Sequence, residues 1–161
     1  MPAIAPKHRT QVAIALAFVV SSTIATMANE QDGIVRVKSA YAMNETISLI
    51  KKDIADKGIR FFSEIDQSKL AADVGVKLRP STLLVFGNPP LGTQFITSNP
   101  NAGLDWPVRL LVTQEGDGSV WTVYTDFGWI ARRHGIGDRD AQFNMATQVI
   151  ASITSSVTAK K

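Results

Sequence analysis

Apolar residues repeat at helical spacing in two segments of this chain. In the first segment they step by four, three and four residues, at Met43, Ile47, Ile50 and Ile54. That spacing lines one face of a helix and predicts an amphipathic helix over 42–57. Asn44 is placed to cap its start, and Gly58 to end it in a left-handed conformation.

The second helical stripe lies near the C-terminus. Its apolar positions step by three, four, three and four residues, at Phe143, Ala146, Ile150, Ile153 and Val157. We expect a helix there that buries this stripe, with Asp138 as its N-cap. Shorter helices are predicted over 67–74, within 91–101 before Pro100, and over 127–134.

Strand patterns separate these helices. Residues 34–40 alternate apolar and polar side chains, which is typical of a strand with one solvated face. Residues 59–65 predict a second strand. Residues 108–113 and 120–125 predict two more, joined by a hairpin turn over 115–118.

A fifth strand pattern differs from the others. Residues Thr82–Phe86 are continuously apolar and lie between Pro80 and Gly87. Such a run is typical of a central strand that is buried on both faces.

The order of these elements indicates the fold class. Strands and helices do not alternate regularly, which argues against a doubly wound parallel sheet. We predict an α+β domain with a single antiparallel sheet and helices packed on one face, in the order β-α-β(4)-α.

The first 28 residues have the pattern of a secretory signal. A basic flank at Lys7–Arg9 precedes an apolar run over Val12–Val20, and small residues lead to a cleavage site after Ala28. The run is short for a membrane span, which needs roughly 20 apolar residues. We therefore expect 1–28 to be a signal peptide and 29–161 a single domain with its core over 34–157. The product would be periplasmic or secreted, and membrane-bound only if the segment stays uncleaved.

Removing this segment changes the charge balance. The full chain has 17 basic and 14 acidic residues, a net charge of +3. Lys7 and Arg9 leave with the signal, so 15 basic and 14 acidic residues remain, a net charge of +1. A near-neutral domain without a basic, aromatic-rich patch argues against a nucleic-acid partner. The absence of cysteine excludes disulfides, thiolate metal sites and cysteine nucleophiles.

Three short motifs resemble a known family. They are Leu83–Pro89 (LLVFGNP), Gly103–Pro107 (GLDWP) and Arg132–Gly135 (RRHG), in this order and spacing. Together they resemble the family called domain of unknown function 302, over roughly residues 34–136. The resemblance implies a TATA-binding-protein-like β-α-β(4)-α fold that is often a homodimer, and it implies no established activity.

His134 is the only histidine after position 28 and the first candidate for chemistry. Imidazole titrates near neutrality, so it suits a general base or a haem ligand. The structural alternative is that Arg132, Arg133 and His134 neutralise the C-terminal end of a helix before Gly135.

Carboxylates that could assist His134 are Asp66 and Asp126. Asp126 lies just before the predicted helix that ends at His134, so the sheet could bring the two together. Glu64 and Asp66 share one side of a strand and could act as an acid–base pair. The alternative for Asp66 is a cap on the following helical turn.

A ligand-binding hypothesis draws on residues near the three motifs, namely Asn88, Asp105, Tyr124, Asp126 and His134. Asn88 could hold loop backbone or offer its amide to a ligand, and the sequence favours neither. An exposed Trp106 would indicate a binding surface, and a buried one a core position.

No metal or cofactor is expected. One histidine without cysteine cannot build a typical zinc site, and the aspartates lack calcium-loop spacing. A haem on His134 with Met43 or Met145 is the remaining alternative, but both methionines lie on predicted core faces.

Two functional hypotheses result. The first is a non-enzymatic exported domain that binds a small ligand or an envelope protein, with a homodimer as its assembly. The second is an enzyme with His134 as general base, oriented by Asp66 or Asp126.

Overall fold

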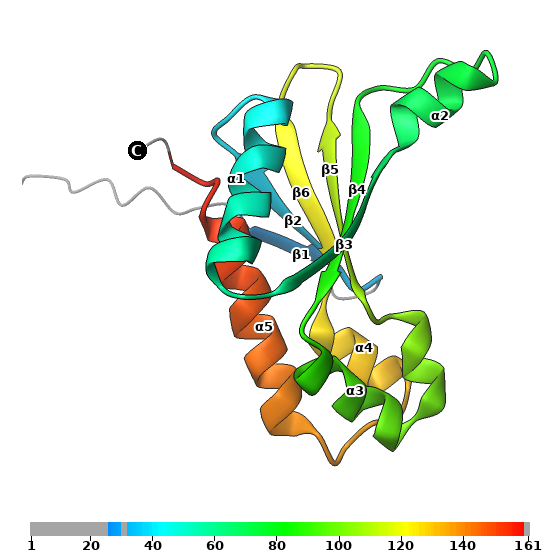
Figure 1. The fold of residues 1–161 in the computed structure, drawn as a ribbon, viewed down its shortest axis with the longest axis vertical. Coiled ribbons are helices and arrows are strands. Elements are labelled where there is room, and N and C mark those ends of the chain that lie inside the picture. The colour runs from blue at the N-terminus through cyan, green and yellow to red at the C-terminus, as the bar shows by residue number, and fades with distance from the viewer. Residues whose placement is uncertain (1–25, 30–31, 160–161) are drawn as a thin grey trace, which may run out of the picture.

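Six β-strands form one sheet in which every neighbouring pair is antiparallel, in the order β1-β2-β6-β5-β4-β3 (Figure 1). The computed structural model describes residues 26–29 and 32–159. The strands are β1 (Thr26–Asn29), β2 (Ile34–Ser39), β3 (Arg60–Asp66), β4 (Ser81–Gly87), β5 (Val108–Gln114) and β6 (Val120–Thr125).

Two long helices cover one face of this sheet, α1 (Met43–Asp56) and α5 (Asp140–Ser155) (Figure 1). The shorter helices are α2 (Gln67–Asp73), α3 (Pro89–Ser98), the 3-10 helix η1 (Pro100–Leu104) and α4 (Phe127–Arg133). The order β2-α1-β3-β4-β5-β6-α5 confirms the predicted α+β architecture, and β1 and the shorter helices are added to it.

The core lies between the sheet and the two long helices. Leu84 and Leu110 are register partners on β4 and β5, and both are fully buried. Ile50 and Ile54 of α1 and Ile153 of α5 close over them with no exposed surface. Each such side chain contributes roughly 1.5–3 kcal/mol of hydrophobic stabilisation, which is why the two predicted stripes form helices in this position.

A smaller aromatic cluster connects the elements beyond the sheet. The ring of Phe95 on α3 stacks on Phe143 of α5 with centroids 4.2 Å apart, and it lies 6.3 Å from Phe127 at the start of α4. This cluster holds α3 and α4 against the N-terminal half of α5.

The prediction that Thr82–Phe86 is buried on both faces is wrong. β4 is second from the sheet edge, and Leu83 and Val85 are only half-buried while Leu84 and Phe86 are buried. Leu83 and Val85 alternate with the buried Leu84 and Phe86, so their side chains lie on the opposite face of the sheet from the core. The continuous apolar run therefore places Leu84 and Phe86 in the core and Leu83 and Val85 on the partly exposed face of the sheet.

Two predicted caps are also wrong. α1 starts after Ala42 without a side-chain cap, so Asn44 lies inside the helix. α5 starts after Arg139, and the Asp138 carboxylate instead accepts hydrogen bonds from Ser98 and Arg139. The bond from Ser98 is the main reason that the pKa of Asp138 lies below its ordinary value of 3.8.

The predicted signal peptide lies mostly outside the described residues, which begin at position 26. Its last three residues belong to β1, which pairs with β2 from Thr26 to Asn29. The predicted cleavage site after Ala28 therefore falls within this strand. Among the described helices, none is both long and apolar enough to span a bilayer.

Candidate functional site: an apolar pocket beside a buried ion-pair cluster

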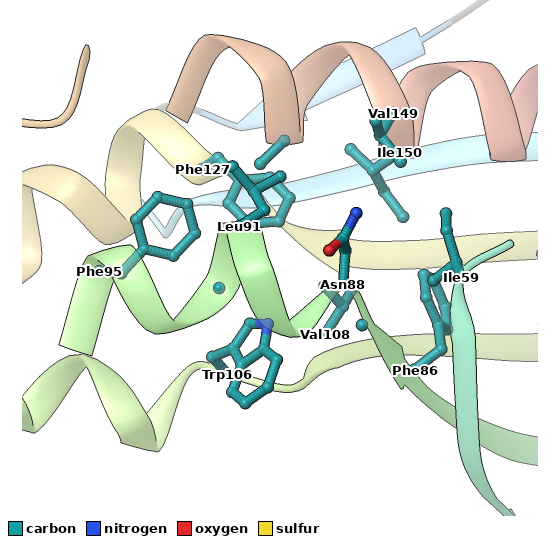
Figure 2. Close-up of a pocket in the computed structure, with 13 residues that line it drawn as sticks. Ile59, Phe86, Asn88, Leu91, Phe95, Trp106, Val108, Phe127, Val149 and Ile150 are labelled. Atoms are coloured by element: carbon teal, nitrogen blue, oxygen red, sulfur yellow. The ribbon is translucent and has the colours of Figure 1, made fainter. Parts of the chain in front are cut away.

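An apolar pocket lies where α3 passes between the end of the sheet and α5 (Figure 2). Its cavity volume is about 40 Å³, and most of its lining comes from β4, α3, β5, α4 and α5, with three residues from the loops beside them. The residues are Ile59, Phe86, Gly87, Asn88, Leu91, Gly92, Phe95, Trp106, Val108, Phe127, Ala146, Val149 and Ile150. All but Asn88 are apolar or aromatic residues or glycine.

Two glycines allow Trp106 to form one wall of this pocket. A Cβ atom at Gly92 would overlap the indole ring, and one at Gly87 would lie 3.1 Å from the indole Nε1. The ring therefore lies directly against the backbone of β4 and α3. Trp106 is half-buried, which is neither the fully exposed position expected of a binding surface nor the buried position expected of the core. Its ring also meets that of Phe62 edge-on, with the centroids 6.3 Å apart.

Two polar groups of the pocket lining have no partner within the described residues. Asn88 occupies the N-cap position of α3, but its side chain makes no cap hydrogen bond. The aspartates Asp66 and Asp126, in the same position on α2 and α4, do make one. The Asn88 amide extends toward α5 (Figure 2), and the indole N–H of Trp106 is likewise unpaired in this part of the chain. The pocket thus offers an amide and one N–H donor.

An open groove of about 390 Å³ continues from the pocket across the surface of α5. The two cavities share Ile59, Asn88, Leu91 and Val149. The groove adds polar side chains, among them Lys57, Gln148 and Ser152. An apolar interior with a polar mouth suits a small amphipathic molecule.

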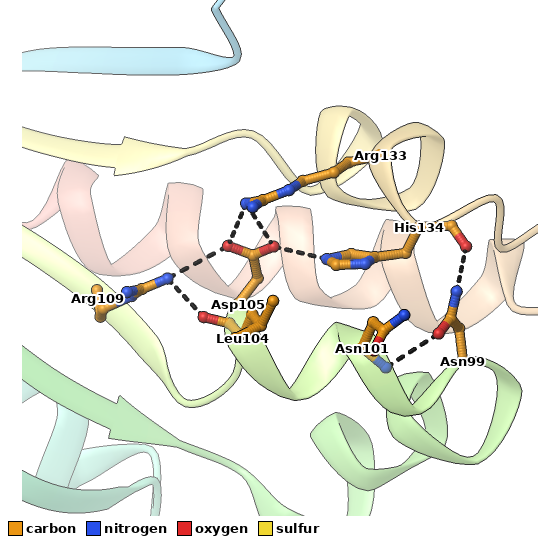
Figure 3. Close-up of polar contacts among 7 residues, drawn as sticks. All are labelled: Asn99, Asn101, Leu104, Asp105, Arg109, Arg133 and His134. Atoms are coloured by element: carbon orange, nitrogen blue, oxygen red, sulfur yellow. Dashed lines mark hydrogen bonds and ion pairs between the residues drawn. The ribbon is translucent and has the colours of Figure 1, made fainter.

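Behind the pocket, the Asp105 carboxylate is the centre of an ion-pair cluster (Figure 3). It lies 2.6 Å from Nε2 of His134, 3.0 Å from Nη1 of Arg133 and 3.2 Å from Nη2 of Arg109. The side chains of Asp105 and His134 are 4% and 5% exposed. An ionised carboxylate can only accept, so Nε2 of His134 carries the hydrogen of this short bond.

This cluster joins three parts of the chain. Asp105 follows η1, Arg109 lies on β5, and Arg133 and His134 end α4. The backbone oxygen of His134 also accepts a hydrogen bond of 2.8 Å from the Asn99 amide. Because Trp106 follows Asp105 directly, the cluster holds the pocket wall in place.

The structure separates the residues of the predicted site. Asp126 caps α4 by accepting from the Trp129 backbone N–H at 2.7 Å, and Asp66 caps α2 through Lys69 in the same way at 2.9 Å. The carboxylate beside His134 is Asp105, which corrects the expected pairing with Asp126 or Asp66.

Tyr124 and Glu64 lie away from this cluster. Tyr124 is buried on the core face of β6, where burial, followed by the charge of Asp126, raises the pKa of its phenol above 10.0. Glu64 pairs with Lys51 of α1 at 2.6 Å. Of the predicted ligand residues, only Asn88 lines the pocket, while Asp105 and His134 form the cluster behind it.

The sequence analysis did not predict the apolar pocket lining, since Leu91, Phe127 and Val149 are ordinary apolar residues within predicted helices. Gly92 was the available signal, because a glycine inside a helical pattern destabilises the helix; in the structure, the indole of Trp106 lies against it. Met145 was expected in the core, but it is 55% exposed and lines the groove. Met43 packs against the core as expected.

No group of three or more histidine, aspartate or glutamate side chains in the described residues is placed to hold a metal ion. The two carboxylate oxygens of Asp105 are occupied by Arg109, Arg133 and His134.

The fold and the pocket define an α+β domain with a small apolar cavity. The model of the family "Domain of unknown function DUF302" matches residues 35–156, and the chain belongs to this family. A crystal structure of an uncharacterized conserved DUF302 protein from Bacillus stearothermophilus superimposes with a TM-score of 0.71 at 17% identity. The match covers 78% of this chain and 98% of the other, so the two share a fold.

Two curated relatives are larger proteins. This chain is 35% identical over 105 residues to proteins named fluoride-specific ion channel FluC 1 from Brucella suis and Brucella abortus. The match covers 65% of this chain but only 41% and 39% of those proteins. The chain therefore spans about two fifths of their length.

The close approach of Trp106 to α3 yields a first prediction. We expect Gly92→Ala to displace the indole and to lower the free energy of unfolding by about 2 kcal/mol, as overpacking does. Tryptophan emission should shift to the red as the ring becomes solvated. Gly103→Ala is the matched control, because a Cβ there meets only Ile96 at 3.9 Å. An unchanged emission spectrum in Gly92→Ala would contradict the placement of the ring.

The ion-pair cluster yields a second prediction. We expect Asp105→Asn to lower the free energy of unfolding in urea by about 3 kcal/mol, because it leaves charged donors around a buried neutral group. Asp126→Ala, which removes only a helix cap, should cost about 1 kcal/mol. An equal or smaller cost for Asp105→Asn would mean that the cluster does not hold η1 and α4 together.

Proposed function

We propose that this protein is an exported binding domain whose pocket receives the apolar part of a small amphipathic molecule. The observation that carries the proposal is the apolar pocket with the unpaired Asn88 amide at its mouth. Buried apolar area supplies affinity in such sites, and a few placed polar groups supply orientation.

The dimensions support a ligand that is only partly enclosed. The inner cavity of about 40 Å³ has room for a short alkyl group or the edge of a ring. The rest of the ligand would lie in the outer groove, beside Lys57 and Gln148. A hydrogen-bonding group at the junction would reach the Asn88 amide, and an acceptor deeper inside would reach the Trp106 N–H.

The N-terminal pattern supports export to the periplasm or beyond. Cleavage after Ala28 would remove three of the four residues of β1. β2 would keep its pairing with β6 along its whole length, so a five-stranded sheet would remain. The fold therefore tolerates the proposed cleavage.

The enzyme hypothesis has less support. The side chain of His134 is 5% exposed, and its Nε2 is bound to Asp105. A general base needs a free nitrogen within reach of its substrate. His134 lines neither the pocket nor the groove, so the arrangement favours a structural role for it.

Export predicts a defined N-terminus. We expect the protein recovered from the periplasm of a bacterial host to begin at Asn29, as measured by intact mass and N-terminal sequencing. Ala28→Arg should retain the segment, because a signal peptidase requires a small residue before the cut. A wild-type protein that starts at Met1 and stays in the cytoplasm would contradict export.

Ligand binding is tested with anilinonaphthalene sulfonate, an amphipathic dye that fluoresces in apolar surroundings. We expect wild-type protein to bind it and Val149→Trp, which fills the pocket mouth, to bind it at least tenfold more weakly. Asn88→Ala should weaken binding about fivefold, the value of one hydrogen bond.

The matched control is Ala151→Trp, which adds the same side chain at an exposed position of the same helix. It should leave the dye affinity unchanged. Equal affinities for Val149→Trp and wild type would place the dye elsewhere on the surface and overturn the proposed pocket.

A further inference from the structure

An arm of exposed apolar residues projects from the sheet between β3 and β4. It consists of α2 and the segment 74–79 that leads to β4, and Figure 1 shows α2 beyond the end of the strands that lies opposite to α3 and α4. Among the described residues, eight large apolar side chains are exposed, and half of them belong to this arm. They are 51% to 75% exposed, at Leu70, Val74, Val76 and Leu78. An apolar patch on one projecting element marks a contact surface.

The turn that ends α2 gathers part of this patch. Gly75 has a φ of +74°, the left-handed conformation that commonly ends a helix. Its N–H donates to the carbonyl oxygen of Ala72, and the N–H of Val76 donates to that of Ala71 at 2.9 Å. These two bonds form a Schellman motif, which returns the chain to the last turn of the helix. Val76 therefore lies beside the helical turn that Leu70 begins.

The charged residues give the arm a positive excess. Residues 67–79 contain three cations, Lys69, Lys77 and Arg79, and one anion, Asp73. Lys69 lies 3.7 Å from Asp73, and Arg79 lies 3.9 Å from Glu115 in the turn after β5. In the part of the chain that the structure describes, Lys77 has no ion-pair partner. The apolar patch is therefore bordered by more positive than negative charge.

We propose that this arm docks on the surface of an anionic lipid membrane. Its apolar side chains would enter the outer part of the acyl region, and its cations would lie among the headgroup phosphates. Short amphipathic elements bind membranes in this way, and anionic lipids strengthen the contact. Lysine and arginine suit such a position, because their aliphatic stems lie against apolar surface while the charge stays solvated. The contact does not involve the N-terminal segment 1–28.

The composition of the arm favours lipid over a protein partner. The apolar cores of protein interfaces are depleted of lysine and enriched in aromatic residues. The arm has no aromatic residue, and its Lys77 stands between Val76 and Leu78. A rigid protein surface would have to offer apolar pockets and anions to alternate residues. A membrane surface offers phosphates and acyl chains side by side, without a fixed shape.

The place of the arm in the fold keeps this contact apart from the ligand pocket. The pocket is lined in part by α3 and α4, which lie at the opposite end of the sheet from α2 (Figure 1). A membrane that meets the arm would leave the pocket accessible. The inference therefore does not rest on the proposed ligand, and either one can fail alone.

The first test is co-sedimentation of the protein with lipid vesicles at low salt. We expect wild type to bind vesicles that contain phosphatidylglycerol, an anionic lipid, about tenfold more tightly than vesicles of neutral phosphatidylcholine. Added salt should weaken the binding, because it screens the cations. Leu70→Glu/Val76→Glu should weaken binding by more than about tenfold. Both positions are more than half exposed, so this variant should keep its circular dichroism spectrum.

The matched control is Leu104→Glu/Met145→Glu. It makes the same two kinds of change, from apolar to acidic, at positions outside the arm that are 66% and 55% exposed. This control should bind the anionic vesicles within about threefold of wild type, because its added charges lie away from the membrane. Wild type and all variants share one N-terminus, so the differences between them report on the arm.

The cations are tested separately. Lys77→Gln/Arg79→Gln should weaken binding to the anionic vesicles about 25-fold, since each cation near such a surface contributes about fivefold. Lys51→Gln/Lys52→Gln removes the same charge from α1, where both side chains are exposed to solvent, and should have a much smaller effect.

A fluorescent label locates the contact. The chain has no native cysteine, so a thiol introduced by Val74→Cys is labelled uniquely with an environment-sensitive dye. Its emission should shift to the blue when anionic vesicles are added, because residue 74 is 75% exposed in the free protein and enters the acyl boundary on binding. The same dye on Leu104→Cys should not shift.

The proposal is overturned if wild type does not bind anionic vesicles at low salt. It is equally overturned if the arm and control variants bind alike, or if the two labelled proteins shift alike. Light scattering identifies the competing explanation. A wild type that ignores vesicles, and has a mass above that of one chain which Leu70→Glu/Val76→Glu reduces to one chain, would assign the arm to a protein contact instead.

Discussion

The position of the pocket depends on one buried carboxylate. Asp105 accepts from His134 and Arg133 at the end of α4 and from Arg109 on β5, so a single side chain fixes the 3-10 helix, a strand and a helix relative to one another. The next residue, Trp106, is thereby held against the backbone of α3. His134 is buried against this carboxylate, and the apolar pocket lies beside the cluster that the two residues form with the arginines.

The second constraint is that, within residues 26–29 and 32–159, the two long helices lie on the same face of the sheet. α1 and α5 bury the core face, and the alternation of β4 and β5 leaves a row of apolar side chains on the other. An antiparallel sheet with one solvated face usually carries polar residues there. The apolar row formed by Leu83, Leu111 and Val123 is an exception to this pattern.

Much of the fold could be predicted because it follows from local periodicity. The stripes at Ile47–Ile54 and Phe143–Ile153 form α1 and α5, since a helix buries whichever face its apolar residues define. The apolar run in β4 misled the prediction, because apolar residues on a strand do not reveal whether the chain itself covers both faces. The caps at Asn44 and Asp138 were misplaced because several polar residues near each helix start satisfy the same local rule.

The sequence by itself determined the kinds of element, their order, the family and the few side chains able to carry charge-based chemistry. Only the tertiary structure decided which of them meet. Asp126 is much nearer to His134 in the sequence than Asp105 is, but Asp105 closes the ion-pair cluster and Asp126 caps a helix. The pocket was beyond prediction for the same reason. It is bounded by residues from five separate elements, and their distances in space are set by packing rather than by spacing along the chain.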